Sequence, residues 1–326
     1  MTDEPLFDLF SFGRRGRGDR LILSVGEIAQ ISRIVSRTPE VVVKVLPRGA
    51  NSLGAVQAHL SYIGRDGDVH LETDDGEILR GKDVGNELLD DWNLELIEQR
   101  GKPNLTSTTT KQPPRLVHKI TFSMPPGTQP DRVHAAVQNF AREEFGLKHR
   151  YVMALHTDEP HPHVHLVIKA VSDQGKRLHI KKATLREWRA GFAHHLRELG
   201  VPANATQRHV RGAMRYQKPD AIYRARLPGE STQFRSRVKD VAQELKQGKL
   251  QVEPGKETLM RTRNYVLRAW LFVSDTLVRQ GHPEISAQVR RNVERMPPPL
   301  TEKEFLAAKM LERVREPRVR EGELTR

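Results

Sequence analysis

The sequence of 326 residues contains no cysteine. Disulfides, a thiol nucleophile and the cysteine-rich closed zinc sites are therefore excluded. No apolar run approaches the roughly 20 residues that a membrane-spanning helix needs. The acidic start, MTDEPLFDLF, lacks the basic flank and long apolar core of a secretory signal. We therefore expect no membrane insertion and a cytoplasmic location.

Acidic residues are too few to balance the basic ones. The sequence has 41 Asp and Glu against 54 Lys and Arg, a formal net charge of +13. A charge this positive suggests a polyanionic partner, either nucleic acid or an anionic surface. A merely basic soluble protein can have the same composition, so charge alone does not identify the partner. The length allows one large domain or two smaller ones.

Histidines gather in one short segment, LHTDEPHPHVHLVIK (155–169). His163 and His165 alternate around Val164 as an apolar run begins, and alternate side chains of a strand point to the same face. His156 ends the preceding apolar run, so a hairpin of the two runs would bring three imidazoles together. Three protein ligands leave positions open for water or substrate, as in catalytic metal sites. The alternative is a structural cluster or a loop that binds metal adventitiously.

The remaining pattern predicts an α+β fold, with a central antiparallel sheet, flanking helices and a helix-rich C-terminal region. The expected strands are 41–46, 116–122, the two runs beside the histidine turn, and 177–180. The expected helices are 52–63, 83–99, 132–145, 184–199, 230–270 and 301–315, with a short strand and helix within 21–35. Asn51 or Ser52 can cap the first of these helices, and Thr184 with Glu187 has the spacing of a capping box.

Tyr62 is one of only five tyrosines, and it stands in the predicted helix end AHLSYIGRDG. A phenol beside Gly64 and Arg65 can be presented outwards to a bound strand. Taken alone, this tyrosine is more typical of a packing residue. The other tyrosines are expected in the core, in a basic segment and in helix packing, so a second catalytic tyrosine is not expected: Tyr151, Tyr216, Tyr223 and Tyr265.

Two stretches together resemble a known family. VVVKVLPRGANSLGAVQAHLSYIGRDG (41–67) followed by HTDEPHPHVHLVI (156–168) is similar to the single-tyrosine relaxases of conjugative and mobilisable elements. The greatest likeness is to the mobilisation-nuclease branch that includes the border endonuclease of T-DNA transfer. The likeness covers about residues 41–200. It implies a relaxase fold of the HUH endonuclease superfamily, named for its histidine motif.

The resemblance assigns roles to particular residues. It implies that Tyr62 is the nucleophile and that His156, His163 and His165 hold a metal ion. Asp158 matches an acidic position that orients a histidine or assists proton transfer, while His161 matches a variable position that supports the site or contacts the substrate. The expected ion is Mn²⁺ or Mg²⁺. The alternatives are Zn²⁺, Co²⁺ and Ni²⁺, which suit imidazole, and no nucleotide cofactor is expected.

The implied activity is site- and strand-specific DNA nicking at an origin of transfer, for conjugative transfer or mobilisation. The tyrosine would remain joined to the 5′-phosphate as a phosphotyrosyl adduct. The DNA would be single-stranded or locally melted. The resemblance also implies an accessory relaxosome protein, a type IV coupling protein and translocation to the recipient cell with the DNA. The basic side chains expected to contact DNA are Lys44, Arg48, Arg65, Lys119, Arg208, Arg211 and Arg215.

The sequence suggests four parts: an N-terminal extension (1–40), the relaxase catalytic domain (41–205), a basic segment (206–229) and a helical C-terminal region (230–326). The basic segment mixes arginines with Tyr216 and Tyr223, which favours strand binding through charge and stacking. A loosely ordered basic linker is its alternative.

Other functions compete with the relaxase. A rolling-circle replication initiator shares the chemistry, but its tyrosine commonly follows the histidine motif. A DNA-binding protein with a structural metal site would not nick DNA. A small-molecule metallohydrolase would not need Tyr62.

Overall fold

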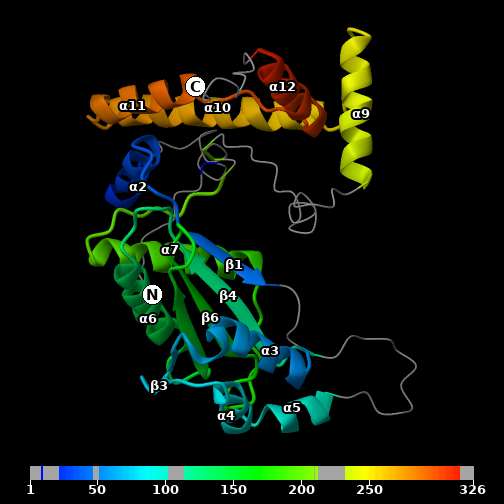
Figure 1. The fold of residues 1–326 in the computed structure, drawn as a ribbon. Coiled ribbons are helices and arrows are strands. Elements are labelled where there is room, and N and C mark those ends of the chain that lie inside the picture. Colours follow the sequence, from blue (N-terminus) through cyan, green and yellow to red (C-terminus); the bar gives the residue numbers. More distant parts are fainter. Residues whose placement is uncertain are drawn as a thin grey trace, which may run out of the picture. The chain divides into compact units, whose positions relative to one another are not determined.

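The computed structural model describes residues 9, 22–46, 51–101, 114–208, 210–211 and 232–315 (Figure 1). The chain divides into two compact units. Described residues of Ser36–Ala205 form the first, and those up to Val35 together with those from Thr206 onward form the second.

A six-stranded sheet forms the centre of the first unit, in the order β1-β4-β6-β5-β2-β3, with every pair antiparallel. Its strands are β1 (Val42–Leu46), β2 (Leu71–Thr73), β3 (Ile78–Leu79), β4 (Val117–Ser123), β5 (Tyr151–His156) and β6 (His163–Lys169). The strands expected near 41–46 and 116–122 and the histidine hairpin are confirmed. The short strands β2 and β3 were not foreseen.

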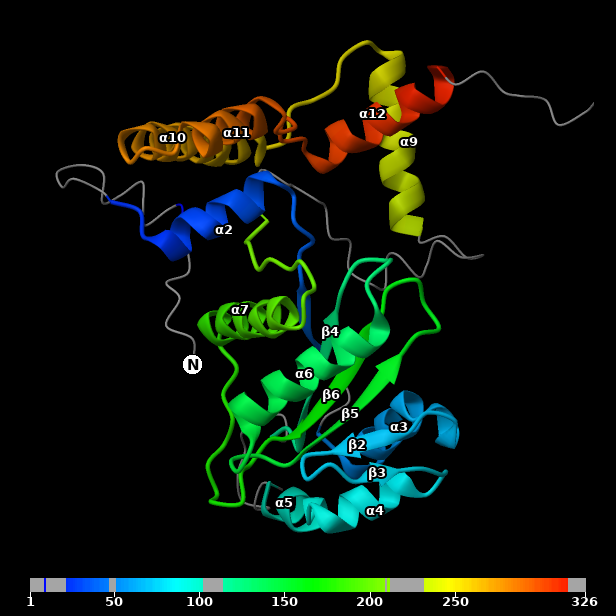
Figure 2. The same ribbon diagram turned by 90° about the vertical axis from the view of Figure 1, so that its left-hand side faces the viewer.

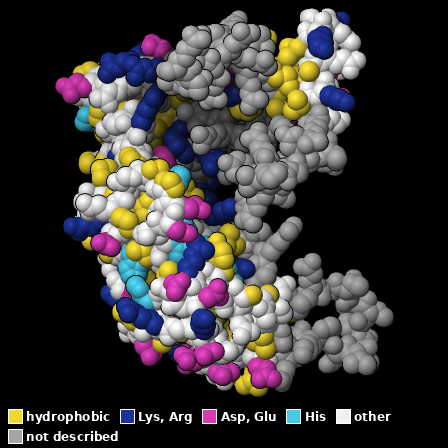
Figure 3. Space-filling model, in the orientation of Figure 1, with side chains coloured by type: hydrophobic (Ala, Val, Ile, Leu, Met, Phe, Trp, Pro, Cys, Tyr) yellow, Lys and Arg dark blue, Asp and Glu magenta, His cyan; other side chains and the backbone are white. Residues whose placement is uncertain are grey.

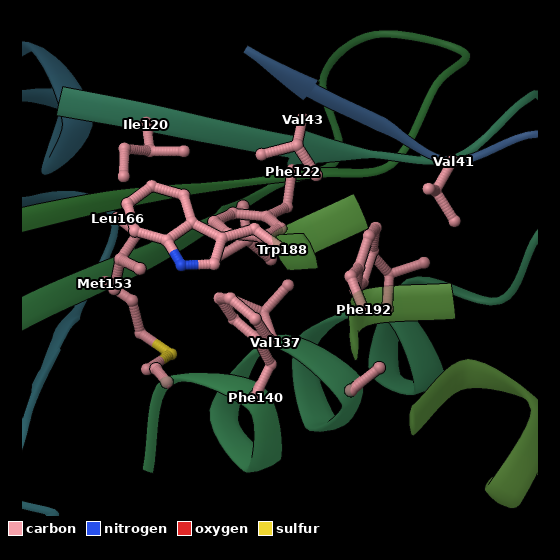
Figure 4. Packing of buried hydrophobic residues seen from close by; sticks show 14 of the residues in the cluster. Val41, Val43, Ile120, Phe122, Val137, Phe140, Met153, Leu166, Trp188 and Phe192 are labelled. Carbon is pink, nitrogen blue, oxygen red and sulfur yellow. The ribbon is translucent and has the colours of Figure 1, made fainter. Parts of the chain in front are cut away.

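Helices cover both faces of this sheet (Figures 1 and 2). One face packs against α6 (Pro130–Phe145) and α7 (Lys182–Glu198). The core there is aromatic, with Phe122 of β4 centred 5.2 Å from both Phe140 and Phe192, and Trp188 close by (Figure 4). Full burial of each such side chain contributes about 1.5–3 kcal/mol. The strong packing fixes β4 and, through its pairing, β6.

The other face packs against α3 (Leu53–Ile63), α4 (Val84–Asp91) and α5 (Leu94–Gly101). Val56, Leu60 and Ile63 repeat at helical spacing and are buried on one side of α3. They share a core with Val152 and Val167 of the two hairpin strands. This packing places the C-terminal end of α3 over the β5–β6 hairpin.

Two predicted elements of the first unit were wrong in detail. The segment 177–180 is no strand, because beyond a single bridge between Val171 and Arg177 it makes no ladder. The predicted helix 83–99 is two helices, α4 and α5, separated near Asn93, whose φ of 50° is left-handed. Asparagine tolerates that conformation better than most residues, and it ends the first helix.

The start of α7 also differs from the prediction. The helix begins at Lys182, so Thr184 lies in its first turn instead of preceding it. The Thr184 hydroxyl accepts a hydrogen bond from the Lys181 backbone N–H at 3.3 Å. A side chain in the first turn therefore reaches back to the N-cap residue, as in a capping box.

The second unit is helical. Its helices are α2 (Val25–Val35), α9 (Thr232–Lys246), α10 (Lys256–Arg279), α11 (Pro283–Glu294) and α12 (Glu302–Arg315). The continuous helix predicted for 230–270 was wrong, since 247–255 separate α9 from α10 and Gly248 has a φ of 68°. Ile31 of α2 is buried with Trp270 and Val289, so α2 shares a core with α10 and α11. No helix among the described residues is both long and apolar enough to cross a membrane.

The α+β class with an antiparallel sheet, flanking helices and a helical C-terminal region is thus confirmed.

Candidate metal and tyrosine centre

The β5–β6 hairpin brings the three predicted histidines together. His156 lies opposite His163 in the register, and Ala154 lies opposite His165. One ring nitrogen of each histidine lies within 4.8 Å of one from each of the others. Within the part of the chain that the structure describes, no other group of three metal-ligating side chains meets this condition. The three side chains therefore can hold one metal ion.

Hydrogen bonds from the backbone orient two of these rings. His156 Nε2 donates to the carbonyl of Ile63 at 2.7 Å, and His163 Nδ1 donates to the carbonyl of His161 at 3.0 Å. Metal-binding histidines commonly donate their second N–H in this way, which fixes the tautomer and frees the other nitrogen. His165 Nδ1 is buried without a hydrogen-bond partner. These observations fit the binding of a divalent ion by the three histidines. The backbone carbonyl of His161 helps to orient His163, whereas the His161 side chain is exposed.

The site favours uncharged imidazoles. Burial lowers the pKa of His165 to about 3, and repulsion from the neighbouring histidines acts in the same direction. Burial also lowers the pKa of His156. Because a neutral imidazole is the form that binds metal, both rings are ready to bind at neutral pH.

Tyr62 lies beside the three histidines. It is in the last turn of α3, and its ring centre is 6.0 Å from that of His165 and 6.4 Å from that of His156. The residue is 54% exposed, although Leu60 and Ile63 on either side of it are buried. The structure therefore presents the predicted nucleophile to solvent next to the predicted metal ligands.

His59 is a member of this centre that the sequence analysis missed. It lies one helical turn before Tyr62, and its ring centre is 6.1 Å from those of both Tyr62 and His165. Its Nε2 is buried without a hydrogen-bond partner, and burial lowers its pKa to about 4. The signal was present in AHLSYIG, because residues three apart share one face of a helix.

The chain turns sharply after α3. Arg65, Asp66 and Gly67 all have positive φ values, of 48°, 53° and 104°. A Cβ atom at Gly67 would lie 2.9 Å from the carbonyl carbon of Gly81. Only glycine fits that position, and the turn it permits directs Arg65 back towards Tyr62.

Arg65 connects the tyrosine to the histidine turn. Its guanidinium carbon lies 5.1 Å from the ring centre of Tyr62, within the range of a cation–π contact. The same guanidinium forms an ion pair with Asp158 and lies 3.4 Å from Nδ1 of His156. Asp158, expected to orient a histidine or accept a proton, is paired here with Arg65. Its charge also offsets the repulsion between Arg65 and a metal ion at His156.

Two predicted DNA contacts lie on the same sheet face as the histidines. Exposed Lys44 of β1 is opposite Thr121 of β4, which is itself opposite His165. Lys119 is two residues from Thr121 on the same strand, so it shares this face. Only 7% of Lys119 is exposed, and burial, with Arg115 nearby, lowers its pKa.

Of the other predicted contacts, Arg65 lies beside Tyr62. Arg208 and Arg211 belong to the second unit. Arg48, Arg215, Tyr216 and Tyr223 lie outside the described residues. In the space-filling view, histidine side chains reach the surface with basic and acidic side chains close by (Figure 3).

Part of the chain matches a known family model. Residues 78–201 match the family model described as relaxase, MobA/VirD2-like, nuclease domain. The T-DNA border endonuclease VirD2 of Agrobacterium fabrum is 23% identical over 227 residues, covering 64% of this chain and 49% of that protein. The VirD2 of Rhizobium rhizogenes is 24% identical over 227 residues, covering 64% and 50%. The chain thus spans about half the length of these relatives.

One solved structure also aligns with the chain. Its title is "Molecular Basis of Vancomycin Resistance Transfer in Staphylococcus aureus", and it covers 52% of this chain and 99% of its own at 14% identity. The TM-score of 0.33 is too low to support a statement about fold or function.

Residues 78–201, which match the relaxase nuclease-domain model, contain β4, β5 and β6 and therefore the histidine hairpin. This match confirms the resemblance found in the sequence. The matched segment contains the three histidines, whereas Tyr62 precedes it.

Proposed function

We propose that this protein nicks one DNA strand at a specific site of an origin of transfer, for conjugative transfer or mobilisation. The observation that carries the proposal is the exposed Tyr62 ring, 6.0 Å from the ring of His165 in the three-histidine group. An accessible nucleophile beside a potential metal site is what tyrosine attack on a phosphodiester requires.

The proposed reaction exchanges one phosphodiester for another. The Tyr62 oxygen bonds to phosphorus, the bond from phosphorus to the 3′ oxygen breaks, and that oxygen takes a proton from solvent. Asp158 accepts the phenolic proton, although its pairing with Arg65 must loosen for it to do so. The product is a 5′-phosphotyrosyl DNA adduct and a free 3′-hydroxyl. Attack by that hydroxyl reverses the reaction, so no nucleotide cofactor is needed.

His156, His163 and His165 are the residues that would hold a divalent ion, either Mn²⁺ or Mg²⁺, with Zn²⁺, Co²⁺ or Ni²⁺ as alternatives. When bound, such an ion stabilises negative charge on the phosphate oxygens. Arg65 holds the ring of Tyr62 from one side, and His59 packs against it at a ring-centre distance of 6.1 Å. These neighbours limit the orientations of the phenol.

We assign the proposed DNA contacts to basic side chains by their position relative to the histidines. Lys44 and Lys119 share the sheet face of the histidines, so we assign them to the phosphates near the nick. As the family resemblance implies, the proposed substrate is single-stranded or locally melted DNA. The remaining proposed contacts are Arg48, Arg65, Arg208, Arg211 and Arg215.

The domain limits and partners extend this proposal. Residues 41–205 would be the catalytic domain, preceded by an extension and followed by a basic segment (206–229). We assign the helical region 230–326 to binding DNA, an accessory relaxosome protein or a type IV coupling protein. The protein would act in the cytoplasm and accompany the DNA into the recipient cell.

A plasmid nicking assay tests the function. Supercoiled plasmid carrying the origin from the same genetic element is incubated with wild type, Tyr62→Phe or His165→Ala, in Mn²⁺, Mg²⁺ or EDTA. We expect one nick at one position with wild type and metal, and none with EDTA or either variant. The control Tyr265→Phe, in the helical unit, should nick as wild type does. Sequence-specific binding without nicking would instead favour a non-catalytic DNA-binding protein.

A further inference from the structure

A pocket of about 450 Å³ opens in the first unit, away from the histidine centre. It is lined by the beginning of β4, by Val45 of β1 and by the segment that leads into α7. His118 and Val45 point to the sheet face opposite the histidines, because Lys119 and Lys44 next to them point to the histidine face. The pocket is therefore separate from the proposed nicking site.

Two arginines give the rim of the pocket a positive charge, and hydrogen bonds hold the rim in place. Arg115 and Arg177 both line the pocket, and the guanidinium of Arg177 donates to the carbonyl of Arg115 at 2.9 Å. Arg177 also forms an isolated antiparallel β-bridge with Val171, and the backbone N–H of Leu178 donates a hydrogen bond to the Ala170 carbonyl at 2.8 Å. These bonds hold the rim in place without an anion. The first turn of α7 borders the pocket too, and a helix N-terminus adds positive potential.

One wall offers a neutral hydrogen-bond acceptor. His118 is only 8% exposed, and its Nε2 donates to the carbonyl of Leu178 at 3.1 Å. Its Nδ1 consequently keeps a lone pair, and this buried atom has no hydrogen-bond partner. Burial lowers the pKa of His118 to about 4, so the ring is neutral at neutral pH. Because this nitrogen is itself buried, a bound molecule would reach it only after a small shift of the side chains around it.

The rest of the lining is mainly apolar, with His179 as a further polar residue. The apolar lining residues are Val45, Pro114, Leu178, Ile180 and Leu185. The volume lies within the range of small-molecule sites. A mainly apolar wall and two guanidiniums match a nucleotide, which has a flat base and a phosphate that arginine binds through two parallel hydrogen bonds.

We propose that this pocket holds one nucleotide of the DNA strand, with its base against Val45 and Ile180 and its phosphate at Arg115 and Arg177. The proposal rests on the proposed function and deepens it, because a pocket that receives one base helps to choose the sequence that is nicked.

A line of positive groups connects the pocket to the nicking site. Arg115 is close enough to both Lys119 and His118 to lower the pKa of each, after the larger effect of burial. Lys119 is in turn a neighbour of His59, beside Tyr62. Along β4, His118 is three residues from Thr121, about 10 Å at the rise of a strand. Because the pocket lies on the other face of the sheet, a DNA strand attached at Tyr62 would pass round the beginning of β4, where Arg115 lies.

Photo-crosslinking tests the placement. The full-length protein is irradiated with random-sequence single-stranded DNA that contains 5-iododeoxyuridine, and crosslinked peptides are identified by mass spectrometry. We expect crosslinks within 114–118 or 177–185, in addition to those near Tyr62. Crosslinks confined to other segments would overturn the proposal.

Matched variants test the chemistry. One variant combines Arg115→Gln with Arg177→Gln and removes both charges from the rim. A second variant, Ile180→Trp, fills the pocket. Each should weaken binding of the same DNA, measured by fluorescence anisotropy, by about tenfold, the usual effect of losing one well-bound base. Arg132→Gln removes an exposed charge from α6 on the same sheet face, and it should bind as wild type does. Unchanged affinity in both pocket variants would overturn the proposal.

Free mononucleotides distinguish a nucleotide site from a simple anion site. dTMP should compete with the DNA for wild type more strongly than inorganic phosphate does, and equal competition would overturn the proposal. Nicking is measured in parallel. If the crosslinks and the competition appear without any nicking, the proposed function fails and the pocket stands. If nicking occurs but the pocket variants bind normally, only the pocket proposal fails.

Discussion

At the scale of residues, the centre depends on a few side chains whose roles are set by their neighbours. Backbone carbonyls fix the nitrogens that His156 and His163 leave available. Asp158 neutralises the one guanidinium that lies beside His156. A bound cation would therefore be close to Arg65, and the pair with Asp158 reduces the electrostatic cost.

From this ion pair we predict the direction in which substitutions of Asp158 and Arg65 change metal affinity. Asp158→Asn leaves Arg65 uncompensated, so Mn²⁺ should bind about two- to fivefold more weakly, a modest effect because both side chains are partly exposed to solvent. Arg65→Gln removes the positive charge and should leave affinity unchanged or raise it. Isothermal titration calorimetry measures both, with His165→Ala as the variant that loses binding. Tighter binding by Asp158→Asn would contradict this account of the pair.

The residues of the centre differed in how well the sequence predicted them. His156, His163 and His165 followed from strand alternation and a short turn, both of which are local. The pairing of Arg65 with Asp158 could not be predicted, because the residues are 93 positions apart and the contact needs a positive φ at Arg65 itself. His59 was predictable in principle, since helical spacing alone places it beside Tyr62.

At the scale of elements, strand register decides whether the centre exists. His163 and His165 face α3 only because Phe122 and Val164 of the same strand pair face the aromatic core instead. A shift of one residue would exchange the two sets of side chains. The packing of Phe122 against Phe140 and Phe192 is therefore what holds the histidines in position (Figure 4).

Removing that packing should be costly. Phe122→Ala deletes a fully buried ring, and we expect it to lower the free energy of unfolding by about 3–5 kcal/mol. Phe122→Leu keeps most of the volume and should cost less. Urea unfolding followed by far-UV circular dichroism measures both variants. A loss below about 1 kcal/mol for Phe122→Ala would show that the aromatic cluster does not fix β4.

The elements that the sequence missed share a physical cause. Strands β2 and β3 are too short for alternation to be visible, and they are stabilised by pairing with β5 and with each other. The segment 177–180 has the composition of a strand but finds no strand to pair with. Amphipathic patterns predicted α3, α6 and α7, whereas α11 was not predicted. The break near Asn93 depends on one backbone conformation.

At the scale of the whole molecule, the chain forms two units with separate cores. From a change of composition we predict a domain boundary near residue 205. The position of α2 could not be predicted, since residues 25–35 share a core with helices more than 200 positions later. Contacts at that separation leave no local pattern in the sequence.

Buried neutral histidines predict acid sensitivity of the first unit. The pKa values of His59 and His118 are lowered from 6.5 to about 4 and that of His165 to about 3, mainly by burial. The unfolded chain therefore binds more protons than the folded protein below about pH 6.5, and stability falls as the pH drops from there towards 4.

We expect the thermal unfolding midpoint in EDTA to fall by roughly 5 °C or more between about pH 7 and pH 4.5. His118→Phe removes one of the three groups and should show a smaller fall than wild type. A midpoint that is constant or rises over this range would contradict the burial of neutral histidines.

The identity of the residue that becomes joined to DNA tests the central claim most directly. Wild-type protein is incubated with metal and single-stranded DNA from its origin, the adduct is digested with protease and nuclease, and the modified peptide is sequenced by mass spectrometry. We predict a nucleotide phosphate on the oxygen of Tyr62. Attachment at another residue, or a cut strand with no protein attached, would contradict the proposed centre.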